Sequence, residues 1–157
     1  MRLIPILILV STIASAQQVD YEQRVLQHFF ENVFPSKYES VSSIEFDGCT
    51  EDELSNFTLF KNCFDLSDET ISALDKKAYK NTFPKKKLDL TEINDISFKK
   101  KKTKSNLRMY FYQANESSGK HYLILGIVKQ KHLTHNYYYE LDGSGEVLQW
   151  CDTGMTH

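Results

Sequence analysis

Tyrosines are the side chains best suited to chemistry in the second half of this 157-residue chain. They alternate with other residues along segments that read as β-strands, at Tyr110 and Tyr112 and again at Tyr137 and Tyr139. An aromatic ring that ends in a hydroxyl group can stack on a sugar ring or an apolar ligand and also form a hydrogen bond. We therefore predict a binding face built on these four tyrosines. The alternative is that they fill a second, smaller core closed by the loops around the first two cysteines.

Lysines form a second candidate site. Residues 76–104 hold eleven lysines and three acids, whereas residues 39–75 hold ten acids and one base. The run Lys99, Lys100, Lys101 and Lys102 predicts a basic patch that would attract an anionic partner. The alternative is that the acidic and basic stretches are solvated surfaces of opposite sign that compensate each other.

Three cysteines stand at positions 49, 63 and 151. Cys49 and Cys63 are the predicted disulfide because they are nearest in sequence, and closing a loop of ~15 residues would stabilise the fold by roughly 3 kcal/mol in the chain-entropy model. Cys63 with Cys151 is an alternative that the sequence leaves open. Cys151 has no neighbouring base that would activate it as a nucleophile.

Metal and cofactor motifs are not recognisable. His132 and His135 lie close together, but a zinc site needs further ligands, and none follows at a familiar spacing, so no metal site is predicted. The sequence also lacks the serine-hydrolase, metalloprotease, phosphate-loop and dinucleotide motifs, and no cofactor is predicted. A non-enzymatic binding or accessory protein is the first hypothesis. The alternative is a small cone-shaped α+β enzyme or ligand carrier, with His121 and a neighbouring Tyr or Glu in a pocket between sheet and helix.

Residues 1–16 have the pattern of an export signal peptide: a basic Arg2, an apolar run, and a small-x-small cleavage site ending at Ala16. The run is too short to span a membrane, which takes ~20 residues. We expect a periplasmic or secreted protein with no transmembrane segment, consisting of one α+β domain over residues 17–157. Its candidate partners are an anionic glycan or an envelope protein, rather than nucleic acid. Two glycosylation sequons begin at Asn56 and Asn115.

The elements that must position these residues are helices first and strands after. Apolar residues recur every three or four positions over residues 20–34, which predicts an amphipathic helix that Pro35 ends. A weaker helix is predicted over residues 67–79, and residues 57–64 read as a strand or a helix start. Strands are predicted at residues 41–46, 93–98, 107–113, 122–131, 137–141 and 146–151. The pattern indicates an α+β fold whose N-terminal helices pack on one face of a curled antiparallel sheet.

The Ala16-Gln17 junction, the strands rich in Lys and Tyr, and the closing run Y-Y-Y-E-L-D-G-S-G-E-V-L-Q-W resemble small exported proteins of unknown function from Bacteroidota-type bacteria. The resemblance implies a periplasmic or secreted setting and carries no catalytic residues. A helix on a curled sheet is also similar in outline to cystatin-like and cone-shaped, nuclear-transport-factor-like domains. The inhibitory Q-x-V-x-G motif of cystatins is absent.

Overall fold

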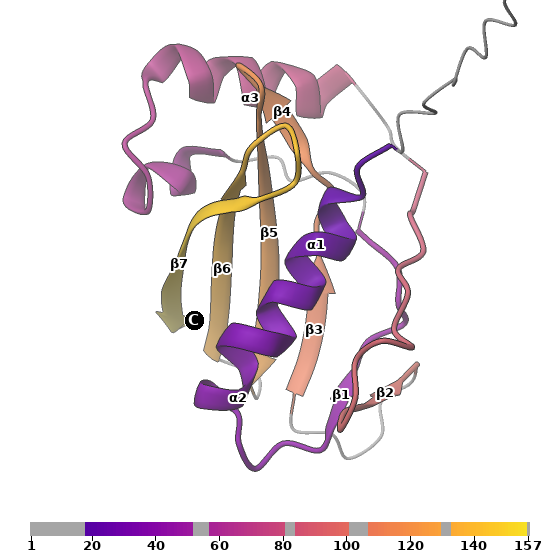
Figure 1. Ribbon diagram of the computed structural model, residues 1–157. Helices are drawn as coiled ribbons and strands as arrows, with labels where there is room; N and C mark the ends of the chain where they lie inside the picture. Colours follow the sequence, from indigo (N-terminus) through magenta and orange to yellow (C-terminus); the bar gives the residue numbers. More distant parts are fainter. Residues whose placement is uncertain (1–17, 52–56, 81–83, 101–106, 130–132, 157) are drawn as a thin grey trace, which may run out of the picture.

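A computed structural model of the chain describes residues 18–51, 57–80, 84–100, 107–129 and 133–156 (Figure 1). The predicted signal peptide, Lys101, Lys102 and the sequon residue Asn56 lie outside the described residues. No helix in the described ranges is long and apolar enough to cross a membrane.

The fold is α+β and is built on one seven-stranded sheet. Its strands are β1 (Ser43–Glu45), β2 (Ser97–Lys99), β3 (Leu107–Phe111), β4 (Asn115–Ser117), β5 (Lys120–Lys129), β6 (Leu133–Leu141) and β7 (Val147–Thr156). The order is β2-β1-β3-β5-β6-β7, and β4 pairs with β5 beyond the end of β3. The three long strands β5, β6 and β7 form the antiparallel meander that the alternating pattern predicts.

The sheet is mixed, which corrects the prediction of an antiparallel sheet. β1 pairs in parallel with both β2 and β3. Parallel neighbours need a long connection between them. Here the chain leaves β1, forms the elements on the far face of the sheet, and returns to lay β2 and β3 on either side of β1.

The N-terminal helix is longer than predicted because it continues through proline. α1 (Tyr21–His28) leads into a π-helical turn, η1 (Phe29–Val33), and then into α2 (Phe34–Lys37). A proline inside an α-helix clashes with the carbonyl group four residues earlier. The wider π-turn, in which Phe34 N donates to Phe29 O, precedes Pro35 and lets the helix run on for one more turn.

The other helices lie on the opposite face of the sheet, so the prediction that helices cover only one face is wrong. The 3-10 helix η2 (Phe57–Asn62) and α3 (Asp68–Lys80) follow β1 in the chain. Side chains of η2 and α3 pack on the face that Tyr122, Ile124 and Tyr138 present. Alternation along β5 divides its side chains between the two faces, with Leu123 and Leu125 turned toward α1.

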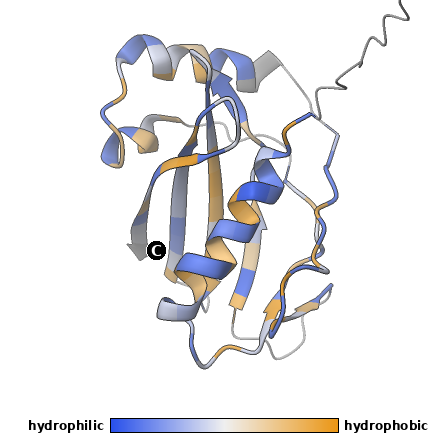
Figure 2. Cartoon of the chain, viewed as in Figure 1, coloured by the Kyte–Doolittle hydropathy of each residue, from blue (hydrophilic) through white to orange (hydrophobic). Residues whose placement is uncertain are grey.

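Two cores result. The α1-side core consists of Val25, Leu26, Phe29, Phe30, Val33, Phe34, Tyr38, Ile44, Phe46, Leu88, Leu107, Met109, Phe111, Leu123, Leu125, Ile127, Tyr137, Tyr139 and Leu141. The α3-side core consists of Phe57, Phe60, Phe64, Ile71, Leu74, Tyr122, Ile124 and Tyr138. Figure 2 shows α1 with its apolar side toward the sheet and its hydrophilic side outward.

The disulfide joins Cys63 to Cys151, with Cα atoms 5.7 Å apart, and Cys49 is free. The predicted pairing of Cys49 with Cys63 is therefore wrong, and the alternative that the sequence left open is correct. Nearness in sequence misled the prediction because β7 brings Cys151 beneath η2, on the face that holds the α3-side core. The bridge ties the cover of that core to an edge strand.

Gly126 lets a tyrosine lie flat across three strands. Tyr110 on β3 pairs with Gly126 on β5, and its hydroxyl group donates to Asn136 Oδ1 on β6. A side-chain methyl group at Gly126 would lie 1.9 Å from Tyr110 Cζ. A glycine inside a strand often marks such a close approach.

Replacing Gly126 with alanine should lower the free energy of unfolding by about 1–3 kcal/mol, because overpacking forces the Tyr110 ring out of its place. Urea denaturation measures the change. In a Tyr110→Ala background the same Gly126→Ala substitution should cost much less, since the two sites are coupled. An equal cost in both backgrounds would show that the ring does not limit this position.

Candidate functional site

The predicted tyrosine face is divided between the cores. Tyr137 and Tyr139 are each 0 % exposed on the α1 side, so the prediction that these two bind a ligand is wrong. Tyr137 shares a 2.9 Å hydrogen bond with the hydroxyl group of Tyr38. Burial is the main cause that raises the pKa of Tyr137 far above its ordinary value. The alternation was recognised correctly, but the helix that covers this face of β6 comes from the other end of the chain.

Tyr110 and Tyr112 lie half-buried on the α3 side, with ring centroids 5.4 Å apart. Tyr112 packs against the α3-side core, as the second-core alternative expects. Tyr110 is held over Gly126 and bonded to Asn136. Both rings have structural partners that account for their positions.

The predicted lysine patch is described only in part. Lys99 is half-buried at the end of β2 and Lys100 is exposed beside it, whereas Lys101 and Lys102 lie outside the described residues. Lys99 contributes its carbonyl oxygen to the sheet edge, where it accepts from Phe46 N. The sequon residue Asn115 is 8 % exposed in β4, and its amide nitrogen donates to Gln113 O at 3.3 Å.

Two of the described histidines, His121 and His135, have polar or stacking partners, whereas His28 Nδ1 is buried without a hydrogen-bond partner. The His121 ring stacks on Tyr21 with centroids 3.5 Å apart, and desolvation is the main cause that lowers the pKa of His121. His135 Nδ1 lies 3.2 Å from Asp152 Oδ1, and Lys37 Nζ lies 2.5 Å from the other oxygen of that carboxylate. Within the described ranges no three His, Cys, Asp or Glu side chains come together as metal ligands.

A groove runs beside the N-terminal helix. One wall is an edge of α1, η1 and α2, and the other is the coil of residues 88–96 that descends beside the helix toward β2 (Figure 1). Three hollows follow one another along it, with volumes of about 440, 260 and 510 Å³. Gln27 and Glu92 line both the first and the second, and Phe30 and Asn94 line both the second and the third. We call this continuous depression the α1 groove.

The two ends of the α1 groove differ in character. The first hollow, near the start of α1, is lined by polar residues such as Asp20, Gln23 and Arg24. The third hollow, below the π-turn, has an apolar lining. That lining includes Phe30, Phe34, Pro35, Val41 and Ile96. An apolar hollow with polar groups at its margin is the usual form of a ligand site.

Carboxylates outnumber bases along the α1 groove. The residues that line the three hollows include Asp20, Glu31, Glu39, Glu92 and Asp95, against Arg24 as the one base among them. All five acids are exposed. A concave surface lined by one sign of charge concentrates ligands of the opposite sign. The groove therefore favours a positively charged ligand.

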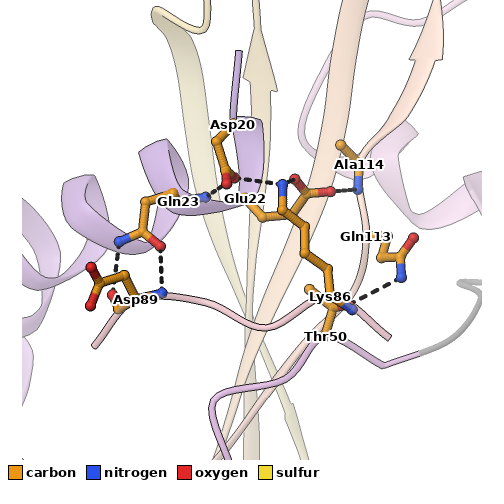
Figure 3. Close-up of polar contacts among 8 residues, drawn as sticks. All are labelled: Asp20, Glu22, Gln23, Thr50, Lys86, Asp89, Gln113 and Ala114. Atoms are coloured by element: carbon orange, nitrogen blue, oxygen red, sulfur yellow. Dashed lines mark hydrogen bonds and ion pairs between the residues drawn. The ribbon is translucent and has the colours of Figure 1, made fainter. Parts of the chain in front are cut away.

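A polar clasp holds the two walls together at the start of the α1 groove (Figure 3). Lys86 Nζ lies 2.7 Å from both Asp20 Oδ1 and Glu22 Oε2. The other oxygen of Glu22 accepts from Ala114 N at 2.9 Å, and the Glu22 side chain is 10 % exposed. Partial burial works against the charge of Lys86, but its hydrogen bonds to the two carboxylates prevail and raise the pKa of Lys86. The backbone N–H of Lys86 donates to Thr50 Oγ1, so the main chain of Lys86 is held in place as well as its side chain.

Glutamine side chains continue the clasp down the groove. The Gln23 amide makes two hydrogen bonds with the backbone of Asp89, one donated at 2.8 Å and one accepted at 2.9 Å. Gln27 Nε2 donates to Glu92 Oε2 at the boundary between the first two hollows. Asp20 also accepts from Gln23 N at 2.9 Å and so caps the start of α1.

Sequence reasoning missed the α1 groove because one of its walls has no periodic pattern. Residues 88–96 read as a strand only from Ile93 onward, and nothing in their order indicates which helix they lie beside. The one available signal was the row Gln23, Gln27, Phe30 and Phe34, which recurs every three or four positions at the edge of the apolar stripe.

Comparison of the chain with protein-family models, with curated proteins and with solved structures finds no match. The candidate site therefore rests on geometry and charge.

Removing either partner of the clasp should destabilise the fold. Glu22→Gln or Lys86→Met leaves a partly buried polar group without its partner, which costs about 1–3 kcal/mol. Thermal or urea denaturation measures the loss, and the double variant should cost less than the sum of the two single variants. The exposed neighbour Lys87 gives a matched control, because Lys87→Met should change stability by less than ~0.5 kcal/mol. Additive costs at Glu22 and Lys86 would mean that the two side chains do not act as a pair.

Proposed function

We propose that this chain is an exported, non-enzymatic binding protein whose α1 groove holds a positively charged ligand of extended shape. The observation that carries the proposal is the run of three connected hollows, along which Glu31, Glu39, Glu92 and Asp95 outnumber the one guanidinium group of Arg24, while Asp20 is already paired with Lys86. A compact ligand would occupy only one of the three hollows. An extended ligand can occupy all three, because they are connected.

The alternative of an enzyme or carrier with a pocket between sheet and helix has less support. The space between α1 and the sheet is filled by side chains of the α1-side core, including Phe29, Leu123 and Tyr139. His121 stacks on Tyr21 and His135 lies within hydrogen-bond distance of Asp152. The proposed ligand class also differs from the anionic glycan predicted for the lysine run, because the groove has the opposite charge. We also propose that α1 and the sheet face that it covers have the outline of a cystatin-like or cone-like domain. Such an outline does not by itself indicate an activity.

Export is the second part of the proposal. The signal-like pattern of residues 1–16 supports it, and so does the Cys63–Cys151 disulfide, since such bonds persist in oxidising compartments. The resemblance to small exported Bacteroidota-type proteins is in keeping with this setting and stays a prediction. An envelope protein with a basic segment is one partner that such a location would offer.

Binding of a labelled basic peptide tests the groove. Fluorescence anisotropy should show that residues 17–157 bind a peptide of alternating lysine and serine, and that they do not bind the matched glutamate peptide. Affinity should fall as salt is added, because exposed charges are screened within ~10 Å at 0.1 M salt. The double variant Glu31→Gln/Glu39→Gln should bind about two- to thirtyfold more weakly, at about 0.2–1 kcal/mol for each exposed charge.

Asp65→Asn/Glu69→Gln is the matched control. It removes two exposed carboxylates from the α3 side and should leave the affinity for the basic peptide unchanged. An equal loss in both double variants would mean that net charge, rather than the groove, attracts the peptide. No binding to the wild-type protein would reject the proposed function.

Intact mass tests the export proposal and the cysteine assignment together. Protein purified from its host and alkylated without reduction should begin at Gln17 and carry one alkyl group, on Cys49. Reduction before alkylation should add two further groups, on Cys63 and Cys151. A chain that keeps residues 1–16, or that takes up three alkyl groups without reduction, would contradict export into an oxidising compartment.

A further inference from the structure

We infer that the ligand of the α1 groove is a segment of basic polypeptide that places one large apolar side chain in the third hollow, with lysine or arginine about three residues away. This inference rests on the proposed function and specifies the ligand. It follows from the shape of the third hollow, from the charges beside it and from the spacing along the helix.

The third hollow suits an apolar side chain. The π-turn brings Phe30 and Phe34 to the same side of the helix, and Val41 and Ile96 face them from two separate loops. Its volume is about 510 Å³, against about 260 Å³ for the second hollow of the α1 groove. Burying an apolar side chain contributes about 1.5–3 kcal/mol, which makes this hollow the anchor point for a ligand.

Two acids at the mouth of the third hollow also favour a basic ligand. Glu39 and Asp95 line it from the two loops, and both are exposed. No base within the described ranges lies within 4.0 Å of either carboxylate. Asp95 has a φ of 68° and lies two residues before the start of β2. These two acids give the mouth of the third hollow a negative charge, which adds to the attraction of the α1 groove for a basic ligand.

The spacing comes from the helix. Gln27, whose partner is Glu92, and Phe34 are seven positions apart, which is ~10 Å along a helix axis. An extended peptide covers that distance in about three residues. A lysine or arginine three residues from the apolar anchor would therefore lie against Glu92. A small polyamine has the charges but no apolar anchor, so a polypeptide fits the whole groove better.

Isomeric peptides test the spacing. The probe is a labelled heptapeptide with phenylalanine at its centre, lysine at both ends and serine elsewhere. A lysine then lies three residues from the phenylalanine whichever way the peptide runs along the groove. Its isomer places both lysines next to the phenylalanine. Fluorescence anisotropy should show the spaced peptide binding about fivefold or more tightly than the isomer, since only the spaced lysines reach beyond the third hollow. Replacing the phenylalanine with serine should cost about tenfold or more.

Filling the third hollow is the complementary test. Ser40→Trp places a large ring there from an exposed position outside the cores and should abolish the preference for phenylalanine over serine. Ser72→Trp, at an exposed position of α3, is the matched control and should keep that preference. Circular dichroism confirms that each variant folds, and the comparison of isomers on the wild-type protein does not depend on either variant.

The outcomes separate this inference from the proposed function. If the spaced peptide and its isomer bind equally well and both are weakened by salt, the inference is overturned. The proposed function, a groove that binds positively charged ligands, would still stand. Spermine that competes as well as the peptide would show a small polyamine to be the ligand class and would also overturn it. No binding of any cationic probe would reject the proposed function itself.

Discussion

A nearly buried carboxylate organises this fold. Glu22 lies in the first turn of α1, accepts from the backbone of Ala114 and pairs with Lys86 from the coil beside the helix (Figure 3). Three parts of the chain distant in sequence thus meet at one charged group, and a charge removed from water needs all its partners. Because the coil is held there, residues 88–96 continue alongside the helix, and the α1 groove exists between them.

Patterns within single elements were predictable from the sequence. The apolar stripe of residues 20–34 and the alternation along residues 107–141 reflect periods of 3.6 and 2, which depend only on neighbours in the chain. The weaker helix predicted over residues 67–79 was correct for the same reason. Pro35 was misjudged because its effect depends on the π-turn before it, which propensity rules do not describe.

Relations between elements were not predictable in this way. Alternation shows that a strand has two faces, but it does not say which element covers each, so Tyr137 and Tyr139 looked available for binding although α1 buries them. The parallel position of β1 and the pairing of Cys63 with Cys151 depend on the path of the chain between elements. The α1 groove was missed because the coil that forms its second wall has no periodicity.

The disulfide divides the molecule into a covalent ring and an arm. Bonding Cys63 to Cys151 closes a ring that contains the coil of residues 88–96, whereas α1 and β1 precede it in the chain and lie outside. The two walls of the α1 groove therefore belong to different topological units. Loop closure restricts the unfolded ring but leaves the arm with its full freedom. The arm can therefore detach without breaking a covalent bond, and the groove exists only while the arm is docked. Detachment of the arm would be a local opening of the fold, which amide hydrogen exchange reports.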